Sequence, residues 1–310
     1  MAASLPGFGG IASRLVHEGL ISEAAMQKVL AESQQQKINL IAYVVDNKLA
    51  QADAVAWVIS REFGDPLIDL DAINVTIDKG KIYALIGHNG SGKSTLIKAL
   101  AGETIPTSGQ ILLQDFADKS IFDLPPKTFA QQVAYLPQKL PDASQFTVAE
   151  LVMLGRYPYQ KWLQKPTPQD HTRVHEAMAL TQVTPFAEQS VATLSGGERA
   201  RAWLAMCIAQ DTPYLLLDEP LAPLDIVYQV EILRLIRDLA RQKNKAIVII
   251  IHDINLAAQF CDEFIALKNG KLCHVGDIAS TMQPQVLDQI FGINLHLLSH
   301  PVTGNKVAVV

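Results

Sequence analysis

The sequence contains no apolar run long enough to cross a lipid bilayer. Its longest, AIVIII from Ala246 to Ile251, has the length of a strand, whereas a membrane-spanning helix needs about 18 consecutive apolar residues. The opening residues, MAASLPGFGG, lack both the basic start and the long apolar stretch of a secretion signal. We therefore expect a protein that neither spans a membrane nor is secreted, so that any membrane role comes through a partner.

Cysteine and positive charge are scarce as well. Cys207, Cys261 and Cys273 are odd in number and scattered, which favours packed, reduced thiols in a cytoplasmic protein over a disulfide framework. The net charge of −5 argues against a general nucleic-acid binder, because such a protein normally presents a basic face.

Low-complexity sequence is absent too, which argues against extended disorder. Hydrophobic residues make up 49% of the chain and charged residues 18%, a composition typical of globular proteins. At 310 residues the chain is long enough for one large or two modest domains, and two is the better expectation.

A phosphate-binding loop is the clearest feature that the sequence does contain. Residues 87–95 read GHNGSGKST and directly follow the apolar segment KIYALI, so they match the pattern G-x-x-x-x-G-K-[ST] in its strand-to-helix setting. The backbone N–H groups of such a loop surround nucleotide phosphates. We predict that this chain binds ATP or GTP.

The residue types of this loop suit phosphate chemistry. Gly87, Gly90 and Gly92 let the backbone approach the phosphates closely, Lys93 supplies a cation for the β and γ oxygens, and Ser94 offers a hydroxyl to Mg²⁺. The helix that follows adds the positive end of its dipole. The predicted nucleotide-binding residues of the loop are Gly87, His88, Asn89, Gly90, Ser91, Gly92, Lys93, Ser94 and Thr95.

Two acidic residues follow a second apolar strand. YLLLDEP, from residue 214 to 220, brings Asp218 and Glu219 to the polar end of that strand, where Asp218 can hold Mg²⁺ and Glu219 can polarise the attacking water. Upstream of it, LSGGERAR opens a helix at which Ser195, Gly196 and Gly197 can present a hydroxyl and backbone donors to an anion.

The chain changes character near residue 72. Residues 10–63 carry helical spacing of apolar residues, with Ser22 able to cap the second helix and with breaks at Asn47-Lys48 and at Gly64-Asp65-Pro66. We predict a small four-helix module within residues 1–72 and a second domain over residues 73–310.

This first segment resembles the N-terminal domain of type IV pilus and type II secretion assembly ATPases. The resemblance lies in SRLVHEGLISEAAMQKVL, in VVDNKLAQ and in EFGDPLIDLDAI. Some members of that domain family bind cyclic di-GMP through an R-L-G repeat, but here Arg14-Leu15 is followed by Val16 and the second repeat lacks its glycine. A docking module, or one that merely packs, is therefore the favoured interpretation.

The second segment has an α/β pattern. We expect strands at NVTID, KIYALIG, GQILLQD, YLLLD and AIVIII, and helices at TLIKALAG, RAWLAMCIAQ, DIVYQVEILRLIRDLARQ and NLAAQFC. Continuous apolar runs of strand length are typical of buried parallel strands. Alternating βα units with a P-loop predict an α/β nucleoside-triphosphatase fold with a parallel sheet.

The motifs of this segment together resemble the ATP-binding cassette of ABC transporters. Besides the P-loop, LSGGE and the DE strand, the family's order is matched by Gln138 in AYLPQ, Asp225 in APLD and His252 in IIIHD. The resemblance implies a cassette with a helical subdomain that hydrolyses ATP with Mg²⁺. It also implies a homodimer in which the P-loop of one cassette faces the LSGGE of the second.

The same resemblance implies roles for the remaining site residues. Ser195 and Gly197, with Gly196 and Asp225, would act on the nucleotide of the partner cassette. Gln138 would link the site to the membrane subunits and contribute to metal binding with Ser94 and Asp218. His252 would contact the γ-phosphate and, with Glu219 and Gln138, complete the catalytic set.

Three further sequence segments indicate which subfamily of ABC transporters the chain resembles. MLGRYPY (153–159), IHDINLAAQFCDEFIALKNGK and IFGINLHLLSHP resemble the ATPase subunits of importers for iron(III) siderophores of the hydroxamate type, with haem and cobalamin importers as relatives. This implies a peripheral subunit at the cytoplasmic face of the inner membrane. It would dock on inner-membrane permease subunits and would not contact the cargo.

The sequence departs from the family in two places. EPLAPLD has Leu221 and Pro223 where the family usually has Thr-Ser-Ala-Leu-Asp after the first proline, which removes a hydroxyl and stiffens the loop. The second departure concerns the family's first strand, whose aromatic residue stacks on adenine. Pilus-ATPase-like sequence stands there instead, and Phe63, in EFG, is expected to be a poor substitute.

Three functional hypotheses remain. The leading one is an ATPase subunit that powers siderophore import. The second is an assembly motor for pili or secretion, against which LSGGERAR and the motif order argue. The third is a chimeric fusion product that binds nucleotide weakly without transport, and an assay of the purified protein would separate it from the first.

Overall fold

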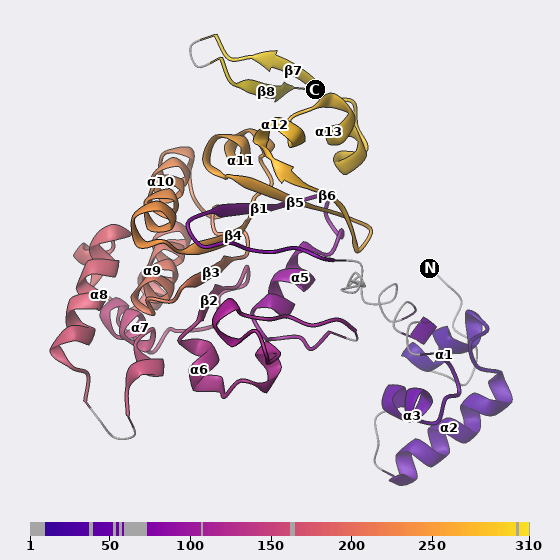
Figure 1. Ribbon diagram of the computed structural model, residues 1–310. Helices are drawn as coiled ribbons and strands as arrows, with labels where there is room; N and C mark the ends of the chain where they lie inside the picture. The colour runs from indigo at the N-terminus through magenta and orange to yellow at the C-terminus, as the bar shows by residue number, and fades with distance from the viewer. Residues whose placement is uncertain are drawn as a thin grey trace. The chain divides into compact units, whose positions relative to one another are not determined.

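The computed structural model describes residues 10–36, 40–51, 54–55, 58, 73–106, 108–161, 165–301 and 304–309. The chain divides into two compact units, Met1–Ile68 and Asp69–Val310 (Figure 1). In the described part of the chain, no helix is both long enough and apolar enough to cross a membrane.

The first unit contains α1 (Gly10–His17), α2 (Glu23–Gln36) and α3 (Leu40–Asp46). The predicted cap of the second helix is confirmed, because the Ser22 hydroxyl accepts a hydrogen bond of 3.3 Å from the Ala25 N–H. The predicted break at Asn47-Lys48 is also found, since α3 ends before it. Most of the predicted fourth helix, and the break at 64–66, lie outside the described residues.

Apolar residues spaced along these helices form the core of the first unit. Leu15, Met26 and Val44 are fully buried, and residues of the following segment join them. A polar contact closes the edge of this core, where the Tyr43 hydroxyl donates to the Glu32 carboxylate. That hydrogen bond, followed by partial burial and the Glu32 charge, raises the pKa of Tyr43.

The second unit is built around a six-stranded sheet in the order β2-β3-β4-β1-β5-β6. The first five strands in this order run parallel, which confirms the predicted parallel sheet, whereas β6 pairs antiparallel with β5. Strands β2, β5 and β6 were not among the predicted strands. The strands are β1 (Ile82–Ile86), β2 (Val133–Leu136), β3 (Tyr214–Leu217), β4 (Ala246–Ile250), β5 (Glu263–Lys268) and β6 (Lys271–Asp277).

Helices pack against both faces of this sheet. The large core lies on the face covered by α9 (Gly196–Ala209), α10 (Ile226–Lys243) and α11 (Ile254–Phe260), whereas α5 (Lys93–Leu100) packs on the opposite face (Figure 1). The remaining helices and strands are α6 (Pro126–Ala130), α7 (Val148–Leu154), α8 (Pro168–Leu180), α12 (Ile278–Thr281), α13 (Pro284–Phe291), β7 (His296–Ser299) and β8 (Lys306–Val309). Helices α7 and α8 pack with α9 as the helical part of the unit.

The predicted strands at NVTID (74–78) and GQILLQD (109–115) are wrong. Burial alternates along 73–78, as in a strand, but neither segment forms a ladder within the described residues, and the second makes only an isolated bridge from Leu112 to Ser120. The segments border a cavity of about 550 Å³ over the α5 face of the sheet. Alternation alone does not make a strand, because each strand needs a neighbour for its hydrogen bonds.

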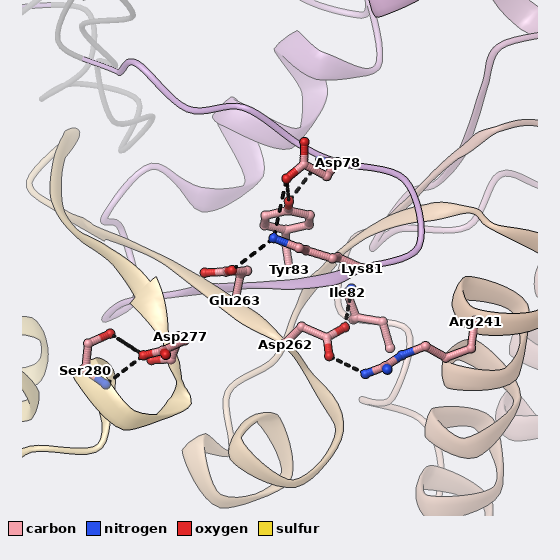
Figure 2. A network of polar contacts seen from close by, with 9 residues as sticks. All are labelled: Asp78, Lys81, Ile82, Tyr83, Arg241, Asp262, Glu263, Asp277 and Ser280. Carbon is pink, nitrogen blue, oxygen red and sulfur yellow. Dashed lines mark hydrogen bonds and ion pairs between the residues drawn. The ribbon is translucent and has the colours of Figure 1, made fainter.

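Polar contacts fix the start of β1, the strand that leads to the P-loop (Figure 2). Asp262 accepts a 2.9 Å hydrogen bond from the Ile82 N–H and also pairs with Arg241 from α10. Lys81 lies 3.2 Å from a Glu263 oxygen and 3.4 Å from an Asp78 oxygen, while the Tyr83 hydroxyl accepts from the Asp78 N–H. Strand β1 is therefore tied to both α10 and β5 before the chain turns into the loop.

Candidate nucleotide-binding site

The P-loop connects β1 to α5 through left-handed glycines. Gly87, Gly90 and Gly92 have φ values of +141°, +75° and +104°, which L side chains rarely adopt. At Gly87 a Cβ would lie 2.2 Å from the backbone oxygen of Leu267 and 2.8 Å from the Ser91 hydroxyl oxygen. The tight turn therefore requires glycine at this position, and it leaves the loop backbone accessible to phosphate.

Lys93 is the buried cation of this loop. Its ammonium group donates 2.9 Å hydrogen bonds to the carbonyl oxygens of Gly87 and His88. Burial lowers its pKa, an effect that the charges of Glu219 and Asp218 oppose. The side chain thus lies across the loop that it is predicted to serve, close to both acidic residues.

Ser91 and His88 are two further polar residues of the loop. The Ser91 hydroxyl is buried and has no hydrogen-bond partner among the described residues, and His88 Nδ1 lies 2.7 Å from the Asn89 carbonyl oxygen. An unpaired buried hydroxyl costs free energy. The loop therefore fits an anion that supplies acceptors to its unpaired donors.

Ser94 and Asp218 come together from α5 and the end of β3. The Ser94 hydroxyl donates to Asp218 Oδ1 at 3.4 Å, a long hydrogen bond. Burial and the neighbouring charge of Glu219 raise the pKa of Asp218, while Ser94, Lys98 and Lys93 pull it down. The pair forms a small set of hard oxygen donors, which is the kind that Mg²⁺ prefers.

Glu219 is held at both carboxylate oxygens by residues from two other elements. Gln138, after β2, donates its amide to Oε2 at 2.8 Å, and His252 Nε2, after β4, lies 2.7 Å from Oε1. The Glu219 backbone is left-handed, at φ +52°, which costs about 1–2 kcal/mol for an L residue. The structure thus brings together the three residues predicted to be catalytic.

The LSGGE residues begin α9. The Ser195 N–H and hydroxyl donate to Glu198 Oε2 at 2.8 and 2.7 Å, and the Glu198 N–H donates back to the Ser195 hydroxyl oxygen at 3.3 Å. Gly197 lies close enough to the Asp225 loop that an added Cβ would be 3.5 Å from the Pro223 carbonyl oxygen. Asp225 itself caps α10 by accepting from the N–H groups of Val227 and Tyr228.

The two halves of the predicted site are not joined within one chain. In the described part of this chain, neither Ser195 nor Asp225 forms a hydrogen bond with the P-loop. Phe63, the expected poor substitute for the adenine-stacking residue, lies outside the described residues. The half of the predicted site that contains the P-loop also contains Asp218, Glu219, Gln138 and His252.

Sequence reasoning missed two side chains of the site. Glu198 forms a capping box with Ser195, and the S-x-x-E spacing could have revealed it. Tyr135, on β2, has a buried hydroxyl that lacks a hydrogen-bond partner within the described part of the chain, and the charge of Asp218 acts on it. Burial first, and then the charges of Asp218 and Glu103, raise the pKa of Tyr135 strongly. Nothing in the run VAYL marks that residue as part of a site.

Known proteins resemble this chain over most of the second unit. The sequence profile described as ABC transporter matches residues 70–222. The petrobactin import ATP-binding protein FpuD of Bacillus anthracis is 38% identical over 251 residues, or 81% of this chain and 90% of that protein. The iron(3+)-hydroxamate import ATP-binding protein FhuC of Bacillus subtilis is 38% identical, covering 80% and 90%.

A solved structure has the same fold. The dimeric structure of MJ0796, a bacterial ABC transporter cassette, superimposes with a TM-score of 0.60 at 26% identity, covering 66% of this chain and 89% of that one. The P-loop, Gln138, the LSGGE residues, Asp218 and Glu219 lie within residues 70–222, which match the family profile. Asp225 and His252 follow that range.

Proposed function

This chain belongs to the ABC transporter family of ATP-binding proteins, and from that premise we propose that it hydrolyses ATP to drive the import of iron(III) siderophores. The observation that carries the proposal is the position of Glu219, which Gln138 and His252 hold at both carboxylate oxygens. Lys93, Ser94 and Asp218 lie on the neighbouring P-loop side. A water-activating carboxylate beside phosphate-binding groups is the arrangement that phosphoryl transfer to water requires.

The loop binds the phosphates of ATP. Its backbone N–H groups and the buried Ser91 hydroxyl meet the phosphate oxygens, and Lys93 exchanges its two carbonyl acceptors for the β and γ oxygens. Ser94, Asp218 and the amide oxygen of Gln138 fit Mg²⁺ as hard oxygen donors. When bound, Mg²⁺ neutralises charge on the β and γ phosphates.

Glu219 acts as the general base. The carboxylate accepts a proton from the attacking water, and its two present hydrogen-bond partners keep it pointed toward the phosphate side of the site. His252, whose side chain is 47% exposed, is free to turn from Glu219 to a γ-phosphate oxygen. Gln138 is exposed as well, and contributes both to the metal site and to contact with membrane subunits.

Two copies of the chain form the complete site. Ser195, Gly196 and Gly197 present the N-terminus of α9 to the nucleotide of the second copy, with Asp225 beside them. Ile226 and Val227, the first residues of α10, are 62% and 61% exposed. Apolar side chains so open to water next to a polar loop fit burial against a partner surface.

The cargo and the membrane partner follow from the relatives and from one exposed turn. The petrobactin and iron(3+)-hydroxamate import proteins named above are ATP-binding subunits for iron chelates. On this chain, Leu154 and Tyr157 of MLGRYPY are 42% and 71% exposed and suit docking on an inner-membrane permease. The chain would then act as a peripheral subunit at the cytoplasmic face and would not contact the siderophore.

The first unit has a separate proposed role. We infer that residues 1–72 form a helical docking module like the N-terminal domain of pilus and secretion assembly ATPases. Its own core around Leu15, Met26 and Val44 supports a self-contained module. In this interpretation the chain is a chimera of two unrelated coding segments.

ATP hydrolysis by the purified chain tests the proposal. The parent should release phosphate from ATP, with a higher rate when a siderophore-importer permease is added. Glu219→Gln should still bind ATP but should not turn it over, because the amide can hydrogen-bond but cannot accept a proton. Glu188→Gln, at an exposed position, is the matched control. Parental turnover by the Glu219 variant would show that this carboxylate is not the base.

A further inference from the structure

Tyr135 lies on the same face of the sheet as Asp218. In the parallel pair of β2 and β3, Tyr135 is opposite Leu216 and Leu136 is opposite Leu217. Side chains alternate between the faces of a strand, so Tyr135, Leu216 and Asp218 share the face that α5 covers. The Asp218 N–H donates to the Leu136 carbonyl oxygen at 2.9 Å, which keeps the two chain segments in register up to the acidic residue.

The hydroxyl of Tyr135 is buried there without a hydrogen-bond partner among the described residues. Leaving a buried hydroxyl unpaired is costly, so such a group in a native protein needs an explanation, of which a functional role or a bound ion is one. The acidic side chains whose charges act on it are Asp218 and, from the segment after α5, Glu103.

Asp218 has one oxygen with an identified donor. Ser94 donates to Oδ1, and in the described part of the chain no side-chain donor reaches Oδ2. A carboxylate that holds a cation through one oxygen is oriented by donors to the other, and such outer contacts affect metal affinity strongly. Tyr135 is an uncharged donor on the correct face to fill this role.

We propose that Tyr135 is a positioning residue of the magnesium–nucleotide site: in the nucleotide-bound state its hydroxyl, which has no partner among the described residues, donates to the Asp218 carboxylate and sets the orientation in which that carboxylate meets the cation. The inference rests on the proposed function, since it assumes that Ser94 and Asp218 hold the cation that accompanies ATP. It adds an orienting contact from β2, which connects the metal site to the strand that also leads to Gln138.

Tyr135→Phe removes only this hydroxyl and is the test. Binding of a fluorescent ATP analogue is measured with the full chain in excess Mg²⁺ and again in EDTA. Losing one hydrogen bond to a charged group should weaken Mg²⁺-dependent binding by about ten-fold, while binding in EDTA should match the parent. Electron paramagnetic resonance of Mn²⁺ with ATP should report the same loss of metal affinity without any turnover.

Tyr83→Phe is the matched control. Tyr83 is a buried tyrosine of β1, a strand that β3 and β4 separate from β2, and its hydroxyl accepts from the Asp78 N–H. Loss of the Tyr83 hydroxyl should therefore leave nucleotide binding unchanged both with Mg²⁺ and in EDTA. Equal Mg²⁺-dependent binding by parent and Tyr135→Phe, or an equal loss with and without Mg²⁺, would overturn the inference alone. A parent that binds no nucleotide in either condition would overturn the proposed function and the inference with it.

Discussion

Lys93 is a buried cation whose direct hydrogen-bond partners in the loop are neutral carbonyl oxygens. Its ammonium group is satisfied by two carbonyl oxygens, while burial lowers its pKa. Phosphate oxygens are better acceptors for a cation than neutral carbonyls. The same side chain is therefore positioned to contribute more to nucleotide binding than to the stability of the loop.

We expect Lys93→Ala to abolish nucleotide binding, because the loop would lose the one cation directed at the β and γ phosphates. Labelling by a photoreactive ATP analogue measures this. Lys243→Ala, at the exposed end of α10, should label like the parent. Undiminished labelling of the Lys93 variant would contradict the role given to this residue.

Glycine can be required in the P-loop for two reasons, the left-handed backbone and the lack of space for a Cβ, and a comparison of Gly87 with Gly90 separates them. Both have positive φ, but an added Cβ at Gly87 would collide with the Leu267 backbone oxygen, whereas nothing lies within 4 Å of one at Gly90. Gly90→Ala should cost about 1–2 kcal/mol of conformational strain. Gly87→Ala should cost clearly more and should also displace the loop. Urea unfolding measures both, and equal losses would mean that the contact with Leu267 is relieved easily.

At the scale of elements, the sequence predicted best those strands that are buried on both faces. YLLLD and AIVIII contain β3 and β4, and both are continuous apolar runs. NVTID alternates instead, GQILLQD has only three consecutive apolar residues, and neither segment forms a ladder in the described residues. Whether an alternating segment becomes a strand depends on a neighbour far away in sequence, which local pattern cannot supply.

The residues of the site also differ in whether the local sequence could predict them. The P-loop, Asp218 and Glu219 follow from local motifs with a known chemistry, and the structure places them together. Tyr135 could not have been predicted, because its approach to Asp218 depends on the register of β2 against β3. Register is a tertiary property, so no spacing within VAYL records it.

A buried ion pair connects three elements of the helical part. The Arg156 guanidinium, just after α7, donates to Asp170 of α8 at 2.9 Å and to the carbonyl oxygen of Ala209, at the end of α9, at 2.8 Å. Both charged side chains are 6% exposed. Burial raises the pKa of Asp170, but hydrogen bonds from Thr167 and Arg156 outweigh it, so the net pKa is lowered.

We expect Asp170→Asn to lower the free energy of unfolding by about 3–5 kcal/mol at pH 7, because it leaves a buried guanidinium without its counter-charge. A carboxyl with a lowered pKa in the folded state stabilises above its unfolded pKa and loses that contribution as the pH falls. The gap between parent and variant should hold from neutral pH down to about pH 4 and shrink below it. Asp288→Asn is an exposed control, and a gap that already narrows above pH 5 would contradict the lowered pKa.

At the scale of the whole molecule, the described chain presents two half-sites rather than one complete site. The P-loop half contains Glu219, while the Ser195 half is closed by its own capping box with Glu198. The nucleotide of a partner cassette would have to replace the Glu198 carboxylate as the acceptor for the Ser195 N–H and hydroxyl. Dimerisation should therefore depend on ATP.

Ser195→Arg should block hydrolysis but leave ATP binding to the monomer intact, because Ser195 would act on the nucleotide of the opposite subunit. Mixing this variant with Lys93→Ala chains should restore at most one composite site, which phosphate release measures. Thr172→Arg, on the exposed surface of α8, is the control. Loss of monomer binding in the Ser195 variant would instead place LSGGE in its own subunit's site.

The junction between the two units raises a question of base recognition. The resemblance to the family implies a first strand whose aromatic residue stacks on adenine, and the sequence predicts that this chain lacks that strand. Stacking on an aromatic ring contributes about 1–3 kcal/mol per base, so we expect ATP to bind roughly ten-fold or more weakly than in a cassette with that strand. Phosphate recognition should survive, which would bring GTP close to ATP in affinity.

Replacing residues 1–72 with the leading strand of a siderophore-importer ATPase tests this expectation. The new strand would lie next to 73–78, an extended segment without a ladder partner in the described residues, beside the cavity of about 550 Å³ over the sheet. Compared with the parent, the chimera should gain more affinity for ATP than for GTP. Titration with both nucleotides measures the ratio of the two dissociation constants. If Phe63 does reach the base, Phe63→Ala would weaken ATP binding in the present chain by a similar factor. Equal ATP affinities in the parent, the Phe63 variant and the chimera would mean that the first strand has no part in recognising the base.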